Sequence, residues 1–173
     1  MKAALISFAL ATGVVGVGTH LTVINALPTF IMSRAFSGLE SSGIGWNAWQ
    51  SAPKITPQTQ SVVRSSPDLA YVVCLLDLSN GPVRISVPRW VRYGSLSIFD
   101  HTTTNVHIES LEGSRPPANV IVATADQSVT DNGTPVIRLP GNKGLALIRR
   151  LAPDTESHQA ATALVKDAEC AVP

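Results

Sequence analysis

Charged residues are scarce in this 173-residue sequence, at 14% of the chain, and the thirteen basic and twelve acidic residues nearly cancel. Proteins that bind nucleic acid neutralise phosphates with a basic surface, and no basic stripe is present in this sequence. Aromatic residues make up only 5% of the chain, which is little material for a platform that stacks sugars or bases. The composition therefore argues against a nucleic-acid partner.

Catalytic and cofactor motifs are also missing from the sequence. It has no Gly-x-Ser-x-Gly elbow, and the Gly-x-Gly at residues 43–45 neither follows a predicted strand nor opens a helix. Asp100, His101 and His107 lie close together, but a predicted turn separates the histidines, and paired cysteines and His-x-His spacing are absent. We therefore expect no metal and no cofactor, and we favour a protein that is not an enzyme.

One region lacks charge altogether, because residues 3–33 contain no Asp, Glu, Lys or Arg. Its strongly apolar part, Ala3 to about Ile24, would span about 33 Å as a helix, close to the roughly 30 Å of a bilayer core. A cleaved signal peptide is the competing interpretation, but its apolar stretch normally runs about 7–15 residues and ends at a small-x-small site. The sequence therefore predicts a retained transmembrane anchor over residues 1–27.

The flanking charges and the cysteines bear on orientation. Lys2 and the free N-terminus precede the apolar segment and Arg34 is the first cation after it, which favours a cytoplasmic N-terminus and a domain outside the cytoplasm. The only cysteines are Cys74 and Cys170, and an even count outside the cytoplasm suggests a disulfide. Two buried, unpaired thiols are the alternative.

Small residues form a stripe along the predicted membrane helix, at Ala9, Gly13 and Gly16. In lipid, such stripes let helix backbones approach closely, and this contact is a main source of helix association. The stripe predicts packing against a helix of another membrane subunit, although glycine is also tolerated in a lone anchor.

The segment after the anchor is expected to connect it to the folded domain. Pro28 is predicted to open a short juxtamembrane helix, Thr29 to Leu39, followed by a linker rich in Pro, Ser and Thr up to residue 67. Trp46 and Trp49 are interpreted as residues at the boundary between water and lipid.

From residue 68 onward the hydrophobic period changes to two, and turn residues separate short β-branched runs. A final helix is predicted from Thr155 to Ala168, with Asp154 as its N-cap. We therefore expect residues 68–173 to form one β domain, a sandwich or a partly closed barrel, with a C-terminal helix. The predicted strands are Ala70–Leu76, Val83–Val87, Tyr93–Phe99, Asn105–Glu109, Val120–Ala125, Pro135–Leu139 and Gly144–Ile148.

Six charges lie beside or within these apolar runs, where a buried charge is rarely left unpaired. They are interpreted as ion pairs at the ends of the sheets. The sharper alternative is a polar cleft for an anionic ligand, formed by Arg92, Asp100 and Asn105. The six charges are Asp77, Arg92, Asp100, Arg138, Arg149 and Arg150.

Several short motifs resemble the domain-of-unknown-function 1254 family over roughly residues 65–150. The motifs are Ser-Pro-Asp at 66–68, Tyr71 with DLSNGPV at 77–83, RYGSL at 92–96, Phe-Asp at 99–100 with Thr-Asn at 104–105, VIRLP at 136–140 and LIRR at 147–150. The resemblance implies a jelly-roll-like β-sandwich. Because the family has no agreed activity, no catalytic residue carries over.

The resemblance also bears on location and partners. The chain resembles the short, membrane-anchored bacterial form of the family, which implies the inner membrane with the domain in the periplasm. In that form a separate sister protein with a domain-of-unknown-function 1214 domain is the expected partner.

The leading hypothesis is a single-pass envelope protein that acts as an accessory or interaction subunit of a membrane assembly. The alternative is a periplasmic enzyme or binding protein for a small anionic or sugar-like ligand, with its site at Arg92, Asp100 and Asn105. A lipid-binding domain is a third interpretation, but it lacks the cationic patch that anionic lipids select.

Overall fold

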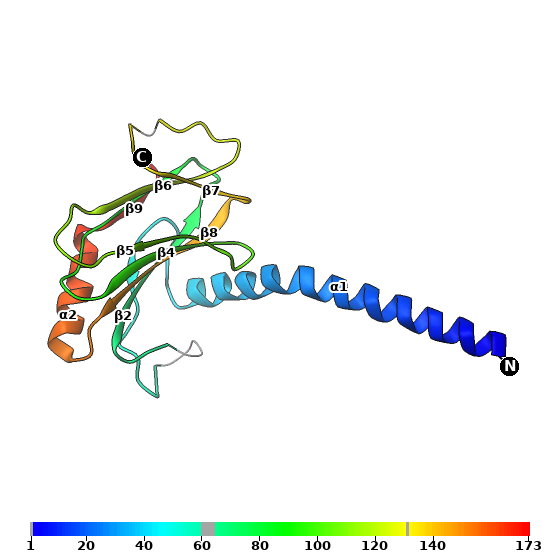
Figure 1. The fold of residues 1–173 in the computed structure, drawn as a ribbon. Coiled ribbons are helices and arrows are strands. Elements are labelled where there is room, and N and C mark those ends of the chain that lie inside the picture. Colours follow the sequence, from blue (N-terminus) through cyan, green and yellow to red (C-terminus); the bar gives the residue numbers. More distant parts are fainter. Residues whose placement is uncertain (1, 60–64, 131) are drawn as a thin grey trace.

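A long N-terminal helix projects from a two-layered β domain in the computed structural model, which describes residues 2–59, 65–130 and 132–173 (Figure 1). This helix, α1, spans Lys2–Ser41. Within the described residues it is the one helix that is long and apolar enough to cross a membrane, over Ile6–Ser41. The apolar segment predicted as an anchor is therefore helical throughout its described length.

The helix continues through Pro28, whereas the sequence predicted a separate helix that begins at this residue. Proline cannot donate a hydrogen bond to the carbonyl of Ile24, and its ring crowds that carbonyl, so a break was expected. Apolar residues on both sides nevertheless continue the same helix, and its last turns are held by packing on the β domain. The predicted helix start at Pro28 is wrong, and a single helix connects the apolar segment to the domain.

The described residues form nine strands in two sheets that pack face to face. The first sheet has the order β1-β2-β8-β4-β5 and the second the order β7-β6-β3-β9. All pairings are antiparallel except that of β6 with β7. The strands are β1 (Gln50–Ser51), β2 (Leu69–Asp77), β3 (Val83–Val87), β4 (Gly94–Asp100), β5 (Asn105–Ser110), β6 (Ala118–Thr124), β7 (Val136–Leu139), β8 (Lys143–Leu151) and β9 (Glu169–Ala171).

All seven predicted strands are present, and β3 matches the prediction at both ends. The short strands β1 and β9 were missed because two or three residues cannot display a period of two. The strand β1 belongs to the first sheet although it lies before residue 68, in the segment that was predicted to be a linker.

The C-terminal helix is shorter than predicted. Helix α2 spans Thr155–Ala163 and is capped as expected, because Oδ1 of Asp154 accepts a hydrogen bond from the N–H of Ser157 at 2.7 Å. A 3-10 turn, η1 (Leu164–Asp167), follows it, and the chain then enters β9. The predicted end at Ala168 is wrong, because Ala168 is already extended to enter the strand that pairs with β3.

The hydrophobic core lies between the two sheets. Alternate residues of β2, Val72 and Leu76 among them, meet Ile85 of β3 and Ile148 of β8, and all four are at most 1% exposed. A disulfide joins Cys74 of β2 to Cys170 of β9, so it links the first sheet to the second. The bond suggested by the cysteine count is therefore present, and the chain contains no free thiol.

The last turns of α1 dock on the outer face of the first sheet. Met32 and Phe36, which are 5% and 6% exposed, pack on Leu75 of β2. Strands β4 and β8 add Phe99 and Leu145 to this contact. The contact joins the projecting helix to the domain through an apolar cluster, so the helix is not merely tethered by a flexible linker.

Trp46 and Trp49, interpreted as residues at the lipid boundary, pack against the protein instead, Trp49 buried and Trp46 half-buried. Trp49 is 9% exposed, and its Nε1 donates to the carbonyl oxygen of Glu169 at 2.8 Å. The ring of Trp46 packs 5.6 Å from that of Phe36, and its Nε1 donates to Oε1 of Glu40 at 2.5 Å. Their apolar rings are taken up by the domain and the α1 junction, which sequence periodicity did not reveal.

Candidate functional site

The three residues predicted to form a ligand cleft do not meet in one place. Arg92 is exposed and precedes β4, whereas Asp100 ends β4 and Asn105 begins β5. The seven residues of β4 span roughly 20 Å, and this length separates Arg92 from the other two. Asp100 and Asn105 share the β4–β5 turn.

Asp100 anchors that turn. Its side chain is 4% exposed, and its Oδ1 accepts hydrogen bonds from N and Oγ1 of Thr102, both at 2.7 Å, and from N of Thr104 at 3.0 Å. Thr103 adopts a left-handed φ of 68°. An aspartate suits this position because its short carboxylate bonds to backbone N–H groups two and four residues ahead. Asp100 thereby fixes the turn that carries His101.

Asn105 also serves the turn. With its amide nitrogen oriented to donate, the side chain reaches the carbonyl oxygens of His107 at 2.7 Å and Ile98 at 3.1 Å. These bonds lie at the register shift between β4 and β5. The polar groups of Asp100 and Asn105 are therefore used within the turn.

None of the six charged residues interpreted as ion pairs forms a close ion pair with another described residue. Arg150, which is 1% exposed, donates to the carbonyl oxygens of Ala161 and Pro88, both at 3.0 Å. Arg138 likewise donates to the carbonyl oxygens of Thr124 and Gln127. The ion-pair prediction is wrong, because guanidinium groups have five donors and here satisfy backbone carbonyls at chain turns.

Burial affects the charge of Arg150 without removing it. Desolvation lowers the pKa of its guanidinium to about 10, so the group still carries its proton at neutral pH. The carboxylate–cation pair of the described residues lies elsewhere, where Glu109 meets Arg89 at 2.8 Å, and the same carboxylate is 3.8 Å from Nε2 of His107.

A row of polar side chains crosses the outer face of the first sheet. Tyr71 of β2 and Ser95 of β4 are both register partners of Arg149 in β8. The hydroxyl of Ser97 accepts a hydrogen bond from Nη2 of Arg149 at 3.1 Å, and Nε of Arg149 is buried without a partner among the described residues. The sequence identified Tyr71 and Arg149 separately, and only the strand register shows that they are neighbours.

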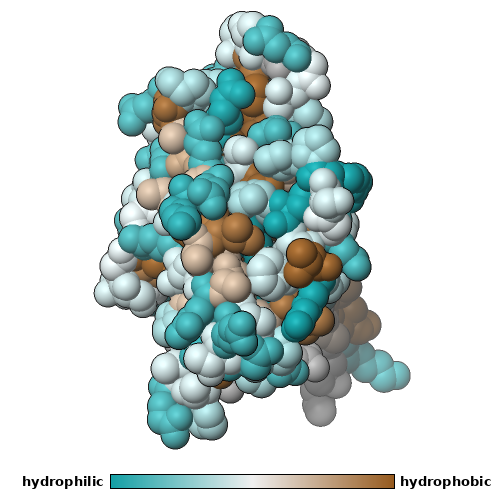
Figure 2. Space-filling view, turned by 90° about the vertical axis from the view of Figure 1, so that its left-hand side faces the viewer, coloured by the Kyte–Doolittle hydropathy of each residue, from teal (hydrophilic) through white to brown (hydrophobic). Residues whose placement is uncertain are grey.

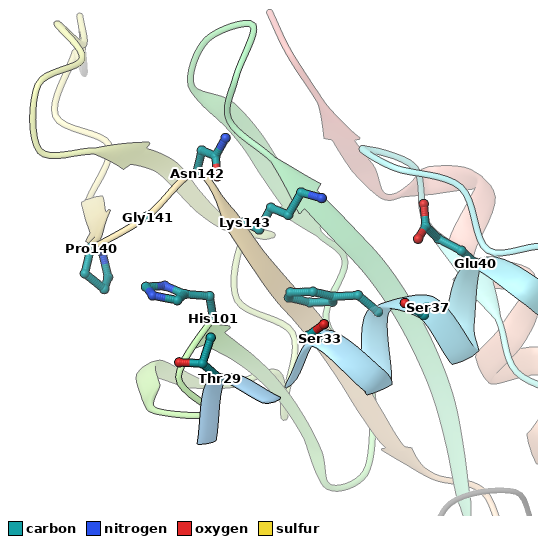
Figure 3. Close-up of a pocket in the computed structure, with 10 residues that line it drawn as sticks. Thr29, Ser33, Ser37, Glu40, His101, Pro140, Gly141, Asn142 and Lys143 are labelled. Carbon is teal, nitrogen blue, oxygen red and sulfur yellow. The ribbon is translucent and has the colours of Figure 1, made fainter. Parts of the chain in front are cut away.

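A cleft of about 370 Å³ opens where α1 meets the β domain (Figure 3). Helix α1 forms one wall, and the β4–β5 and β7–β8 turns form the other. The volume lies at the lower end of the range for small-molecule sites, roughly 300–1,000 Å³. The lining residues are Thr29, Ser33, Phe36, Ser37 and Glu40 from α1, with His101, Pro140, Gly141, Asn142 and Lys143 from the turns.

Hydroxyl groups line the helical wall of this junction cleft. Thr29, Ser33 and Ser37 are spaced four residues apart, so they lie on one face of α1. Within the described part of the chain, none of the three hydroxyls makes a side-chain hydrogen bond. The wall therefore presents a row of free donors and acceptors. The carboxylate of Glu40 lies at the end of this row nearest the C-terminus of α1.

The opposite wall carries an imidazole and an ammonium group. The His101 ring lies against Gly141, and a Cβ at that position would be only 2.9 Å from Nδ1 of His101, so glycine is required for this contact. Nδ1 is buried and has no partner among the described residues. Lys143 places its Nζ 4.7 Å from the centre of the Trp46 ring, an arrangement that a cation–π interaction favours.

No pattern in the sequence predicts this cleft. His101 was predicted only as a possible metal ligand, and Glu40, Gly141 and Lys143 were not among the predicted site residues. No group of three or more His, Cys, Asp or Glu suited to a metal ion occurs among the described residues. Because the cleft joins segments far apart in sequence, no local motif marks it.

The small-residue stripe lies outside both sites. Ala9, Gly13 and Gly16 are exposed on the projecting part of α1. A Cβ added at Gly13 or Gly16 would meet no atom within 4 Å. The predicted packing of this stripe against another helix stays a prediction.

Comparison with known proteins addresses the family. A family model described as "Protein of unknown function (DUF1254)" matches residues 46–171. The fold is similar to that of the VPA0106 protein from Vibrio parahaemolyticus, with a TM-score of 0.61 and 19% identity over 82% of this chain and 34% of that one.

A protein from Burkholderia cenocepacia described as putative and uncharacterized gives a TM-score of 0.44 and 11% identity over 63% of this chain and 32% of that one. This chain therefore spans about a third of the length of these solved structures. No curated protein matches it. Since the family model covers most of the chain, including both sheets, this protein belongs to the domain-of-unknown-function 1254 family.

Proposed function

We propose that this protein is a single-pass membrane-anchored envelope protein whose β domain serves as an accessory or interaction subunit of a membrane assembly. The observation that carries the proposal is the exposed apolar surface of α1. Phe8, Val14 and Val15 are 71%, 73% and 67% exposed, and this surface continues to Ile31. A helix that is apolar on all sides requires an apolar environment, which a bilayer supplies.

The surface of the β domain supports a position in water, outside the bilayer that is proposed to hold α1. Figure 2 shows the side of the molecule turned away from α1, where hydrophilic residues predominate and apolar residues are scattered. Such a surface suits an aqueous compartment. The Cys74–Cys170 disulfide suits an oxidising one, which supports placing the domain in the bacterial periplasm and the N-terminus in the cytoplasm.

An interaction role follows from the junction and the stripe together. The apolar docking of Phe36 on Leu75 transmits the position of the helix to the domain, so a partner bound to one also constrains the other. Ala9, Gly13 and Gly16 offer a smooth contact to a second membrane helix. We propose a membrane subunit as this partner, for which a separate sister protein with a domain-of-unknown-function 1214 domain is the first choice.

For the fold we propose the jelly-roll class. The chain crosses between the sheets repeatedly, at β2–β3, β3–β4, β5–β6, β7–β8 and β8–β9, and β8 lies between β2 and β4. Such crossings between two packed sheets are typical of double Greek-key sandwiches. The ligand site expected at Arg92, Asp100 and Asn105 forms no part of the proposed function, because the length of β4 separates Arg92 from the other two.

Anchorage and orientation are tested first. Membranes from cells that express the full chain are washed with alkaline carbonate, and intact spheroplasts are treated with protease. The chain is expected to stay with the membranes, and its domain is expected to be digested from the periplasmic side. Release by carbonate would contradict the anchor, and protection of the domain would contradict the orientation.

The partner is tested with the small-residue stripe. Gly13→Leu with Gly16→Leu roughens the proposed contact, whereas Val15→Leu alters the opposite face of α1, about 200° around the helix from Gly13. After mild-detergent purification, native mass spectrometry is expected to show a co-purifying membrane protein with wild type and with Val15→Leu, and its loss with the double variant. A monomer in all three cases would refute the accessory role.

A further inference from the structure

We propose that the junction cleft binds the phosphate-bearing headgroup of a membrane lipid. The proposal deepens the function proposed above and rests on it, because it requires α1 to cross the bilayer. Its starting point is the position of the cleft beside α1 (Figure 3), a helix whose exposed apolar side chains extend as far as Ile31.

The height of the cleft follows from helix geometry. Thr29, the cleft residue nearest the N-terminus, lies five residues beyond Ile24, about 7.5 Å further along α1. A bilayer with a core of roughly 30 Å is about 40–45 Å thick with its headgroups, so each headgroup layer is about 5–7 Å deep. Phe30 and Ile31, next to Thr29, are still 57% and 51% exposed. Measured from Ile24, Thr29 therefore lies at the outer edge of the headgroup layer, and the exposed apolar side chains beside it extend the lipid-facing surface up to this level.

The chemistry of the lining suits a phosphate. Thr29, Ser33 and Ser37 supply free hydroxyl donors. Lys143, whose Nζ lies over the Trp46 ring toward the Glu40 end, supplies a cation that forms no close ion pair within the described residues and that a long side chain can turn toward a ligand. Charge-assisted hydrogen bonds to phosphate oxygens are among the stronger polar contacts in proteins. Glu40 is the only carboxylate in the lining, and it lies at the end away from the membrane, where a headgroup ammonium would extend.

His101 adds a donor of fixed orientation. Because its Nδ1 is buried against Gly141, Nε2 is the ring nitrogen left to face a ligand, and a proton on Nε2 makes it a donor. The turn that carries His101 is held by the three hydrogen bonds to Asp100. The imidazole is therefore positioned before a ligand arrives, which lowers the entropic cost of binding.

A lipid source is favoured over a free phosphate ester by the surroundings of the cleft. Phe36 forms part of its wall, and the ring of Phe30, which is 57% exposed, flanks its lower end on α1. Acyl chains attached to a bound headgroup would lie along this apolar surface. A soluble ester would gain nothing from it.

The test uses the full chain in mild detergent, with bound lipids counted by native mass spectrometry. The probes are phosphatidylethanolamine, phosphatidylglycerol, diacylglycerol, which lacks the phosphate, and soluble glycerophosphate. Wild type is expected to retain one phospholipid, and neither diacylglycerol nor glycerophosphate at the same concentration. His101→Ala with Lys143→Ala is expected to weaken phospholipid binding about tenfold or more.

Two further variants keep the test specific. His158→Ala with Lys166→Ala makes the same chemical change away from the cleft, and its lipid binding is expected to equal that of wild type. Gly141→Ala forces the His101 ring to move and is expected to weaken binding while the circular dichroism spectrum and melting temperature stay close to wild type. Lipid counts are compared only between variants that pass this folding check.

The outcomes separate the two proposals. Equal phospholipid binding by wild type and the cleft variants, or equal binding of diacylglycerol, would overturn the headgroup site while the carbonate test still supports the anchor. Retention of glycerophosphate in preference to phospholipid would overturn the lipid source. If carbonate releases the wild-type chain, the anchor itself fails.

Discussion

Arg150 illustrates how single residues hold the β domain together. It is the largest fully buried side chain, and its two hydrogen bonds join the loop before β4 to the last turn of α2. The carbonyl of Ala161 is one of those that a helix C-terminus leaves without an intrahelical partner, so the guanidinium acts as a cap. A cation here is also favourable to the helix dipole.

Arg150→Ala is therefore expected to destabilise the protein by about 3 kcal/mol, since it opens a cavity and leaves two buried carbonyls unsatisfied. Urea unfolding of the full chain in detergent, followed by tryptophan fluorescence, measures the loss. Arg115→Ala, at an exposed arginine, serves as the control and is expected to change stability by less than about 0.5 kcal/mol. Similar unfolding midpoints for the two variants would contradict the capping role.

His158 provides a prediction of pH dependence. Burial lowers the pKa of its imidazole below the ordinary 6.5, the charge of Lys54 acts in the same direction, and Nε2 has no partner among the described residues. The folded state thus holds the neutral ring, and the unfolded chain takes up a proton first as the pH falls. Stability is fully present above pH 6.5 and is lost as the pH falls from there through the folded-state pKa.

The free energy of unfolding should accordingly decrease as the pH falls from about 6.5, the ordinary pKa of histidine, and level off below the lowered pKa of the folded state. His158→Gln, which does not titrate, is expected to flatten this dependence. The lowered pKa values of Asp77 and Asp154 act in another window, because their ordinary value is 3.8 and their contribution is lost only in more acidic solution. An unchanged slope in the His158 variant would exclude this residue as the source.

At the scale of elements, the docking of α1 depends on one aromatic side chain. Phe36 is 6% exposed and packs on Leu75 and Trp46. Phe36→Ala is expected to weaken docking by about 3 kcal/mol, because truncation of a buried aromatic leaves a cavity at the contact. Amide hydrogen exchange of residues 32–46 should increase while the exchange of β6 stays constant.

Phe30→Ala is the matched control for this change, since Phe30 is 57% exposed and lies outside the docking cluster. It is expected to leave the exchange of residues 32–46 as in wild type. Faster exchange in both variants would indicate that α1 is held by something other than the Phe36 contact.

The disulfide makes a second contribution at this scale. It closes a loop between residues that are 96 positions apart in sequence. In the chain-entropy model, closing such a loop stabilises the folded state by about 4–5 kcal/mol. Cys74→Ala with Cys170→Ala is expected to lose most of this, and dithiothreitol should lower the melting temperature of wild type but not of the double variant.

An element can be predicted from the sequence when the residues that determine it lie close together in the chain. β2 to β8 were predicted because alternation and turn residues are local, and Asp154 marked the start of α2 for the same reason. The docking of α1 escaped prediction because Leu75 was one apolar residue in a continuous run. Only the completed sheet shows that its side chain faces outward.

The candidate sites were less predictable still. The row formed by Tyr71, Ser95 and Arg149 depends on strand register. The junction cleft brings His101 and Lys143 against residues of α1 that are some 60 to 110 positions away in sequence. Arg92 was grouped with Asp100 because the two are close in the chain, although an extended strand carries them apart. Proximity in sequence was a poor guide wherever a strand intervened.

For the whole molecule, the tryptophans report how the domain stands on the membrane. Trp49 and Trp90 are buried, Trp46 is half-buried against Phe36, and Trp90 donates from its Nε1 to the carbonyl oxygen of Leu151 at 3.0 Å. In vesicles that contain brominated lipids, the fluorescence of wild type is therefore expected to be quenched only weakly. Phe30→Trp adds an exposed indole beside the proposed membrane surface and should be quenched strongly.

Strong quenching of wild type would place Trp46 among the lipids, and the domain would then sit deeper than the geometry of α1 implies. Weak quenching of Phe30→Trp would instead place residue 30 in water and move the membrane boundary toward the N-terminus. The two proteins together thus locate the bilayer surface along α1.

Adjacent residues of β2 face opposite ways: Leu75 receives the helix, and Cys74 is bonded to the final strand of the other sheet. A pull on the anchor therefore enters the domain at the strand that is covalently tied to the far layer. Tension would be shared by both layers at once, so the sandwich would resist being peeled open. A domain that is loaded through α1 would gain mechanical durability from this arrangement.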